Sequence, residues 1–404
     1  GFLERGTYSG WYCTSDEQFL SDADVNLPVK PGDIATSKHS GREVERTEES
    51  NIVFNLGKQK TELLKYIESV EVLPKERVNQ IVNDIKRISE QLSVTRDSQR
   101  VRWGIKCPSD DSQTLYVWLD ALANYLTVSG YFNGGNENIW PPDYQLMGKD
   151  IATFHCIYWP AFLMAAGIPQ PKRFVIHAHW TKDRMKMSKS IKNIVDPLSC
   201  LETYSVDMLR FYLLLEGGLL DDGDFSFTTL DTRVNGDLCN HYGNLLSRAT
   251  AKSINPSQTY PLTSTEKLPG VHENILAALE NLPDDVETSF EKLQFGKGLR
   301  DIFAVIRDCN VFFEENAPWK LLKSSETDKL NHVLYTTFEV LRIVSILLQP
   351  IIPEASGRAL DKLNVPKNKR SKKFAKLHAL DSDICGSNLP SDPLVLFSKI
   401  KPQK

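Results

Sequence analysis

The feature that most constrains the fold of this chain is a change in sequence pattern near residue 221. Before it, apolar runs rich in β-branched residues, such as 174–178, alternate with helical periods, and we expect helices at 58–90 and 201–215. From residue 231 on strand signals vanish, and helical periods recur at 231–253, 273–292, 295–317, 328–348 and 352–364. This pattern predicts an α/β domain followed by an antiparallel helix bundle, joined at the Asp/Gly-rich stretch 221–224.

Length, charge and cysteine content limit the class of protein. A chain of 404 residues can form two or three domains with their own cores. Because the net charge is only -4, any nucleic-acid surface must be a local patch; residues 365–377 are the most basic run, a mobile loop or a phosphate contact, and we favour the loop. The seven cysteines stand singly, which argues against a disulfide framework or zinc knuckle. No run approaches the roughly 18 apolar residues of a membrane helix.

The string Lys186-Met187-Ser188-Lys189-Ser190 follows an apolar run and precedes a turn at 196–197. Two ammonium groups three residues apart, with hydroxyls between them, suit a loop that grips polyphosphate, because flexible point charges can follow phosphate oxygens. For a Lys-x-x-Lys pair alone, a solvated basic turn is the commoner explanation.

Trp118 and Tyr125 are seven residues apart, so a helix over that span would place both on one face. Two aromatic rings suit a thioether, whose sulfur gains about 0.3–1.5 kcal/mol at a ring edge. The alternative is an aromatic stripe of the core.

Gly148-Lys149-Asp150 follows a short strand pattern and opens a helix, a place where nucleotide groups approach backbone N–H groups closely. Ile151 and His155, four residues apart, share one face of that helix. A lone histidine on an apolar helix is more often a hydrogen-bonded core residue.

In the helical region, Asn240, Asn244 and Arg248 recur every four residues, and Trp319 stands at a helix end. Amide and guanidinium groups can read base edges, and an aromatic ring can stack an unpaired base for about 1–3 kcal/mol. The alternative is that these polar residues form an ordinary solvent-exposed helix face.

Taken in order, these motifs resemble the methionyl-tRNA synthetase family of class I aminoacyl-tRNA synthetases over nearly the whole chain. The resemblance implies a Rossmann-like α/β nucleotide-binding domain whose N-terminal half is missing, followed by an all-α anticodon-binding bundle. Residues 1–57 would belong to the connective insertion, 58–220 to the remainder of the catalytic domain with the lysine-serine loop, and 221–404 to the bundle. Only Cys13 stands where relatives cluster zinc ligands, so we expect no structural zinc.

The resemblance also implies roles for individual residues. The substrates would be methionine and Mg-ATP, and the partner would be tRNA(Met). The protein would be a monomer in the mitochondrial matrix, with no membrane association. The implied residues are Lys186 and Lys189 for catalysis; Gly148, Asp150, His177, Trp180, Met187, Ser188 and Ser190 for ATP; Trp118, Leu122, Tyr125, Ile151 and His155 for methionine; and Asn244, Arg248 and Trp319 for the CAU anticodon.

The sequence departs from the family pattern in several places. Arg184 and Lys192 stand where relatives commonly have glycine, and Leu122 replaces a common proline. The family's His-Ile-Gly-His segment is absent, so we expect it, with any transit peptide, upstream of residue 1, and we expect that these 404 residues alone cannot complete the adenylation site. Two alternative functions remain. A class I synthetase of another amino-acid specificity would lose Trp118, Tyr125 and His155. A tRNA-binding module without catalytic activity would not need to keep both lysines of the lysine-serine loop.

Overall fold

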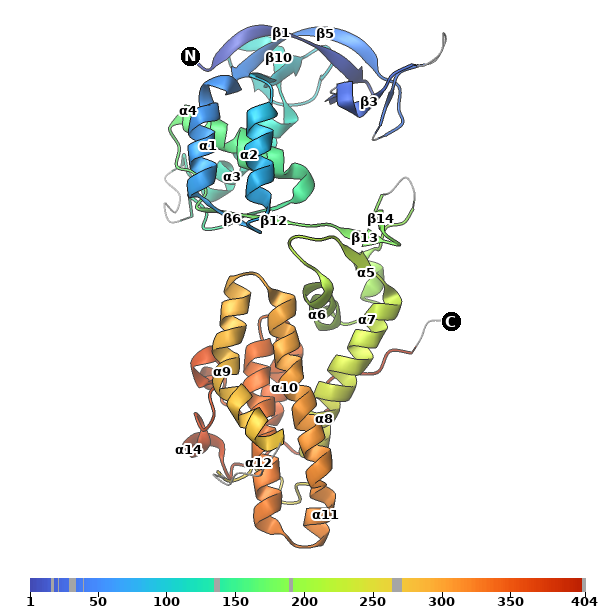
Figure 1. Ribbon diagram of the computed structural model, residues 1–404, viewed down its shortest axis with the longest axis vertical. Coiled ribbons are helices and arrows are strands. Elements are labelled where there is room, and N and C mark those ends of the chain that lie inside the picture. Colours follow the sequence, from blue (N-terminus) through green and yellow to red (C-terminus); the bar gives the residue numbers. More distant parts are fainter. Residues whose placement is uncertain are drawn as a thin grey trace. The chain divides into compact units, whose positions relative to one another are not determined.

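The computed structural model describes residues 1–15, 18–20, 22–28, 34–38, 40–133, 139–188, 192–263 and 271–401. It divides into two compact units, Gly1–His177 and Ala178–Lys404, whose elements are labelled in Figure 1. Two of the predicted site residues, Lys189 and Ser190, lie outside the described residues.

Three sheets and a short strand pair make up the β-structure of the first unit. The largest sheet is antiparallel, with the order β2-β1-β5-β7; a second antiparallel sheet has the order β8-β10-β9, and a parallel sheet has the order β11-β12-β6. The strands are β1 (Leu3–Cys13), β2 (Gln18–Leu20), β3 (Val25–Asn26), β4 (Thr36–Ser37), β5 (Glu45–Asn55), β6 (Glu71–Leu73), β7 (Gln91–Ser93), β8 (Thr95–Asp97), β9 (Lys106–Cys107), β10 (Asp110–Leu115), β11 (Gln145–Gly148) and β12 (Arg173–His177).

Helices pack against the parallel sheet because their apolar stripes face strand β12. The helices are α1 (Lys60–Ser69), α2 (Arg77–Arg87), α3 (Val117–Ser129), the 3-10 turn η3 (Lys149–Ile151), the π-helical turn η4 (Phe154–Tyr158) and α4 (Trp159–Ala166). Figure 1 shows α1 and α2 side by side, and one apolar core joins both to Phe174 and Ile176 of β12. The expectation of helices over 58–90 misses β6, because this short strand exists through its parallel pairing with β12.

The second unit is mainly helical, as the sequence pattern predicts. It opens with the hairpin β13 (Trp180–Lys182) and β14 (Met185–Lys186), to which β15 (Gly223–Phe225) adds a parallel strand. The helices are α5 (Pro197–Cys200), α6 (Val206–Glu216), α7 (Phe227–Arg233), the π-helical segment η5 (Val234–Gly243), α8 (Asn244–Ala249), α9 (Val271–Glu291), α10 (Phe295–Asn316), α11 (Pro318–Lys323), α12 (Thr327–Leu348), α13 (Pro353–Lys362), the 3-10 turns η6 (Lys367–Lys369) and η7 (Lys372–Phe374), and α14 (Asp381–Ile384).

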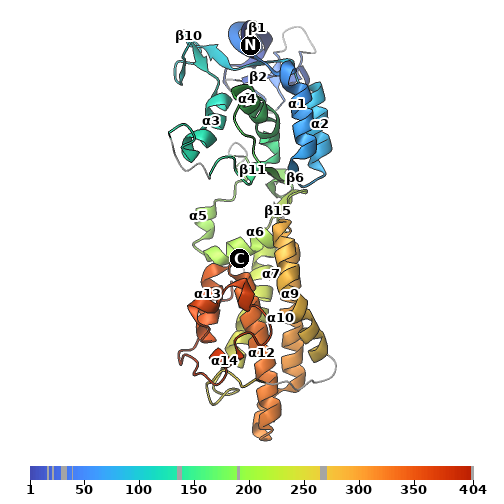
Figure 2. The same cartoon turned by 90° about the vertical axis from the view of Figure 1, so that its left-hand side faces the viewer.

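Helix α12 is the centre of the bundle. Every residue from His332 to Leu348 is buried, and Figures 1 and 2 show α9 and α10 running beside it. All five predicted helical periods of this region are confirmed within a few residues, because long amphipathic stripes are the clearest signal that a sequence carries.

The predicted helix at 201–215 is shorter than expected. Residues 201–204 form turns, and α6 begins only at Val206. Ser205 caps α6 by accepting a hydrogen bond from the backbone N–H of Met208 at 3.3 Å, which is the usual role of serine at a helix start. The apolar stripe therefore predicted this helix but placed its start at 201, before the true start at Val206.

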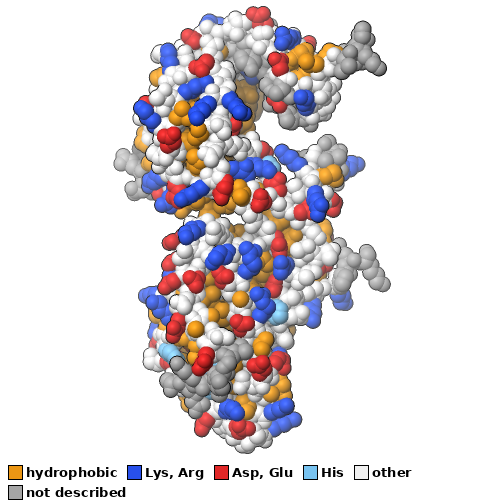
Figure 3. Space-filling view, in the orientation of Figure 1, with side chains coloured by type: hydrophobic (Ala, Val, Ile, Leu, Met, Phe, Trp, Pro, Cys, Tyr) orange, Lys and Arg blue, Asp and Glu red, His pale blue; other side chains and the backbone are white. Residues whose placement is uncertain are grey.

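The basic run 365–377 is folded against the bundle by ion pairs. Lys369 binds Asp383, Arg370 binds Asp361, and Lys372 binds Asp284. On the face shown in Figure 3, basic and acidic side chains are interspersed over each unit. Within the part of the chain that the structure describes, no helix combines the length and the apolar character that crossing a membrane requires.

Candidate functional site

Helix α3 and the turn η4 bring together three of the predicted methionine-binding residues. As the spacing predicts, α3 spans both Trp118 and Tyr125. The Tyr125 hydroxyl lies 2.9 Å from Nε2 of His155, and the Trp118 and His155 rings meet edge to face, with centroids 6.4 Å apart. His155 is 4% exposed. An aromatic wall therefore adjoins a buried imidazole.

The hydrogen bonds of His155 fix its tautomer. Nδ1 lies 3.0 Å from the carbonyl oxygen of Ile151, which can only accept, so Nδ1 carries the proton. Nε2 is then the acceptor, and the Tyr125 hydroxyl donates to it. Burial lowers the pKa of His155, partly offset by the bond to Ile151, and burial raises the pKa of Tyr125. The chain Tyr125–His155–Ile151 is therefore uncharged at neutral pH.

Two further residues shape this wall. Phe154, which the sequence interpretation missed, stacks on Trp118 with centroids 3.7 Å apart and ring planes 15° apart. Its only sequence signal was its position directly before His155. Leu122 is 1% exposed, in an apolar cluster against which Tyr125 and Phe154 pack. Leu122 thus supports the rings from within the core.

His155 and Phe154 lie in the π-helical turn η4, whereas the sequence predicts ordinary helix there. Such turns are rare and are frequent at functional sites, because one extra residue re-aims neighbouring side chains. The second π-helical segment, η5, ends at Gly243, directly before Asn244. Both predicted recognition sites thus adjoin a distorted helix.

The predicted ATP-binding residues of the first unit gather at the carboxyl end of the parallel sheet. Gly148 ends β11 and His177 ends β12, and the two residues are paired in register. Asp150 is exposed in the turn η3, which starts the helix after β11. Ligands of open α/β sheets bind outside the carboxyl ends of the strands, where helix N-termini present backbone N–H groups.

Trp180 starts the hairpin of the second unit and packs on two glycines. A Cβ atom at Gly223 would lie 3.0 Å from its indole ring, and one at Gly217 would lie 3.1 Å from it. The indole also contacts Tyr212 and Phe225, with centroid separations of 5.7 and 6.3 Å. The backbone of Trp180 is therefore firmly placed.

The described part of the lysine-serine loop continues this hairpin. Lys186 ends β14 with an exposed side chain, and Met187 packs partly buried against the core of the unit. The side chain of Asn193, which the sequence interpretation missed, accepts from the backbone N–H of Ser188 at 2.7 Å and donates to the carbonyl of Lys186 at 3.1 Å.

Arg184 and Lys192, the two residues that replace glycine, keep the backbone conformation that glycine favours. Arg184 has a φ of 59° and Lys192 a φ of 54°. Asp183, beside Arg184, has a φ of 56°, and two such residues in succession form the tight turn typical of a two-residue hairpin. A left-handed conformation costs an ordinary residue about 1–2 kcal/mol, so surrounding contacts must hold this turn.

The predicted anticodon-binding residues Arg248 and Trp319 meet in the bundle. The Arg248 guanidinium lies 5.6 Å from the ring centroid of Trp319 and 5.1 Å from that of Phe313. Its Nη1 atom also binds Oε1 of Glu314 at 2.5 Å. Asn244 is exposed, one helical turn before Arg248. A planar cation close to two aromatic rings, with an exposed amide one helical turn away, suits contact with unpaired bases.

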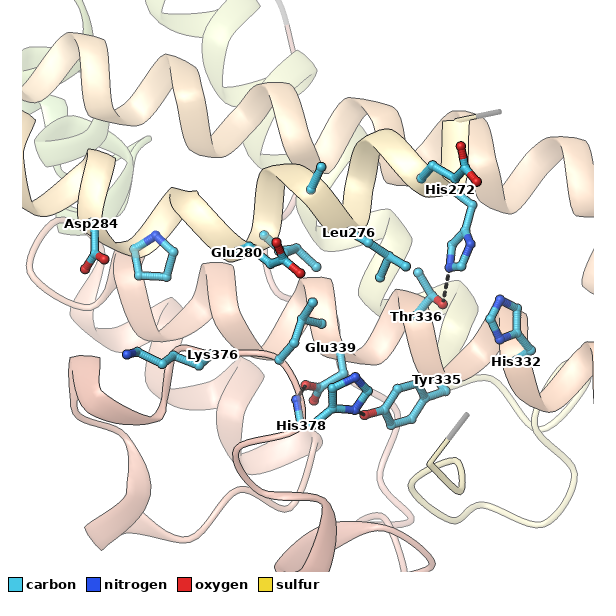
Figure 4. Close-up of a pocket in the computed structure, with 15 residues that line it drawn as sticks. His272, Leu276, Glu280, Asp284, His332, Tyr335, Thr336, Glu339, Lys376 and His378 are labelled. Atoms are coloured by element: carbon cyan, nitrogen blue, oxygen red, sulfur yellow. Dashed lines mark hydrogen bonds between the residues drawn. The ribbon is translucent and has the colours of Figure 1, made fainter. Parts of the chain in front are cut away.

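A separate cavity of about 870 Å³ lies between α9, α12 and residues 376–378, and Figure 4 shows the polar and apolar residues that line it. The carboxylate of Glu339 accepts hydrogen bonds from Arg342, Tyr260 and the backbone N–H of His378. Tyr335 bonds to His378. Because these groups satisfy one another, we assign them to holding residues 374–378 against α12 and not to ligand binding.

The described residues contain no group of three or more His, Cys, Asp or Glu side chains that could hold a metal ion. Cys13 is fully buried in a small apolar cluster with Leu20, Val25 and Val44. The sulfur atom therefore packs as part of a core.

Comparison with known proteins gives consistent matches along the chain. Residues 1–250 match the family described as tRNA synthetases class I (M), and residues 264–404 match the anticodon binding domain of methionyl tRNA ligase. The mitochondrial methionine–tRNA ligase of Xenopus laevis is 40% identical over 99% of this chain and 73% of its own length. The probable mitochondrial enzyme of Dictyostelium discoideum is 38% identical, with the same coverage.

Solved structures give the same result. Mycobacterium tuberculosis methionyl-tRNA synthetase bound by methionyl-adenylate has a TM-score of 0.87 at 32% identity, over 98% of this chain and 78% of that chain. The free form of the same enzyme has a TM-score of 0.86 at 31% identity.

Proposed function

Because the chain belongs to the methionyl-tRNA synthetase family of class I tRNA synthetases, we propose that it activates methionine with ATP and transfers it to tRNA(Met). The observation that carries the amino-acid specificity is the uncharged chain Tyr125–His155–Ile151 beside the Trp118 ring. A neutral donor–acceptor chain and an aromatic face suit a thioether, whereas a charged side chain would find no counter-ion in it. Leu122 would complete the methionine site by packing in the apolar cluster behind these rings.

In the first step, a methionine carboxylate oxygen attacks the α-phosphorus of ATP. The bond from that phosphorus to the bridging oxygen breaks, giving methionyl-adenylate and pyrophosphate. Lys186 and Lys189 would act as catalytic residues by stabilising the charge that develops on the pyrophosphate. Mg²⁺ would arrive as the ATP complex, held by phosphate oxygens.

The remaining ATP contacts follow from position. Gly148, Asp150 and His177 stand at the carboxyl end of the parallel sheet, where ribose and phosphate groups can approach backbone N–H groups. We assign the adenine contacts to the backbone at Trp180, and the loop contacts to Met187, Ser188 and Ser190.

In the second step, a terminal ribose hydroxyl of the tRNA attacks the carbonyl carbon of the adenylate and expels AMP. Asn244, Arg248 and Trp319 would select the tRNA by reading its CAU anticodon. The support is the flat Arg248 guanidinium held beside the Trp319 ring, since stacking and amide hydrogen bonds are how proteins read unpaired bases.

We further infer that the chain serves mitochondrial protein synthesis in the matrix, because several relatives carry mitochondrial names. We propose a monomer as its state. The functional boundaries we propose are 1–57, 58–220 and 221–404. The compact units instead divide at His177, because the hairpin of the lysine-serine loop packs with α6 and β15.

The test is amino-acid-dependent ATP–pyrophosphate exchange in the complete natural enzyme. Methionine should support exchange, and Lys186→Ala should lower kcat by about 10²- to 10³-fold, the usual effect of removing one group that stabilises transition-state charge. Lys182→Ala, on the same hairpin but outside the motif, is the matched control and should have little effect. Full exchange in Lys186→Ala would overturn the assigned role of this lysine, and preference for another amino acid would overturn the specificity.

A further inference from the structure

Two side chains outside the Lys186–Ser190 motif hold the hairpin around Lys186, one by binding its backbone and one through its cross-strand partner. Lys186 ends the edge strand β14 and is paired in register with Thr181 of β13. Its ammonium group lies on a long flexible stem, so the position of its Cα atom sets the region that this group can reach. Whatever fixes the backbone at Lys186 therefore fixes where its charge can act.

The first support is the side chain of Asn193. Its amide group donates to the carbonyl of Lys186 at 3.1 Å, and its oxygen accepts from the N–H of Ser188 at 2.7 Å. One planar side chain thus binds the backbone on both sides of Met187, whose own side chain packs against the core. Lys192, directly before Asn193, has a left-handed φ of 54°, a conformation that must be held by such contacts.

The second support is Asp224, on the strand that pairs with β13. One carboxylate oxygen, Oδ1, accepts from the hydroxyl of Thr181 at 2.7 Å and from the backbone N–H of Arg184 at 2.9 Å. The Thr181 hydroxyl also lies 3.1 Å from the carbonyl oxygen of Gly223. These hydrogen bonds lower the pKa of Asp224, so it accepts as a carboxylate at neutral pH. Asp224 thus ties the hairpin turn and the cross-strand partner of Lys186 to β15.

We propose that Asn193 and Asp224 are positioning residues for the adenylation step, which act by holding the backbone of Lys186 in register. The inference rests on the proposed function, because it gives these two side chains a role only through that lysine. Neither residue needs to touch a substrate. The hydrogen bonds carry the assignment: Asn193 binds the backbone at Lys186 and Ser188. Asp224 binds the hairpin at its turn and at Thr181, the cross-strand partner of Lys186.

The experiment is a double-mutant cycle in the complete natural enzyme, with methionine-dependent ATP–pyrophosphate exchange as the readout. Asn193→Ala should lower kcat about 10- to 100-fold, the scale of a displacement of about 1 Å, with the KM for methionine within about 2-fold. In a Lys186→Ala background the same change should cost less than about 3-fold, because the group being positioned is already gone.

Conservative variants separate positioning from general destabilisation. Asp224→Asn keeps an oxygen acceptor for Thr181 and Arg184 and should retain most of the activity, whereas Asp224→Ala should behave like Asn193→Ala. Asn193→Gln keeps both amide groups but moves them by one methylene, so it should not rescue. Thermal unfolding of each variant serves as the folding control.

The outcomes distinguish the inference from the function on which it rests. If Lys186→Ala leaves exchange unchanged, the proposed role of the lysine fails, and the inference fails with it. If Lys186→Ala is impaired but Asn193→Ala is fully active, or its effect multiplies in full with that of Lys186→Ala, the positioning role alone is overturned. Rescue by Asn193→Gln would also overturn it, because the exact reach of the amide would then be irrelevant.

Discussion

Tyr125→Phe should weaken methionine binding through His155. The substitution removes the hydroxyl that donates to Nε2 at 2.9 Å, while Nδ1 stays bound to the carbonyl of Ile151. In the free variant a water molecule can replace the lost donor, but a thioether must expel that water and leave Nε2 without a partner. A buried unsatisfied acceptor costs about 1–3 kcal/mol, which corresponds to a rise of about 5- to 150-fold in the KM for methionine.

The assay is ATP–pyrophosphate exchange at varied methionine and saturating ATP. The KM for ATP should stay within about 2-fold, because His155 contacts the amino-acid side of the proposed site. Tyr144→Phe is the matched control: its ring is 44% exposed, and its hydroxyl bonds Arg173 at the surface. A methionine KM within 2-fold of the parent in Tyr125→Phe would refute the assignment of this hydrogen bond to the methionine pocket.

Three further predictions concern the bundle and the hairpin. Arg248→Lys keeps the charge but loses the flat guanidinium beside Trp319, so its binding free energy for a CAU transcript should weaken by about 1–2 kcal/mol in filter binding, while the dependence of affinity on salt concentration stays the same. An unchanged affinity would contradict contact between Arg248 and a base. Arg184→Gly should raise the free energy of unfolding, measured by denaturant titration, by about 0.5–1 kcal/mol, because removing the cost of the left-handed φ outweighs the larger conformational entropy that glycine loses on folding. A loss of stability would contradict backbone strain at Arg184. Burial, with a smaller effect of His272, lowers the pKa of His332 to about 4. The free energy of unfolding should therefore be constant above pH 6.5 and fall by about 1–2 kcal/mol toward pH 4, less than the full pKa shift implies because the imidazole lines an open cavity. His332→Gln should remove this pH dependence.

The sequence predicted best the features that repeat locally. The bundle helices were found because amphipathic stripes persist over many turns. The seven-residue spacing of Trp118 and Tyr125 predicted that they share one helix face, and α3 spans both residues. In each case the signal lies within one element.

The features that the sequence did not predict depend on contacts between distant segments. Strand β6 has three residues and exists through its pairing with β12, about 100 positions later in the chain. Asp224 holds a turn 40 positions before it, and nothing distinguishes it in the sequence from the other aspartates of the Asp/Gly-rich stretch 221–224. Phe154 stacks on Trp118 only because the π-helical turn η4 directs it there. Chain topology creates these contacts, so no local pattern encodes them.

The most direct test of the central claim is the rate at which the complete natural enzyme attaches methionine to tRNA(Met) transcripts that differ only in the anticodon. We predict efficient charging with CAU, and a large loss in kcat/KM, of about 10²-fold or more, when one anticodon base is changed. The same loss should follow Trp319→Ala with the unaltered transcript. Equal charging of all transcripts would contradict anticodon reading by the bundle, and charging with an amino acid other than methionine would contradict the proposed function itself.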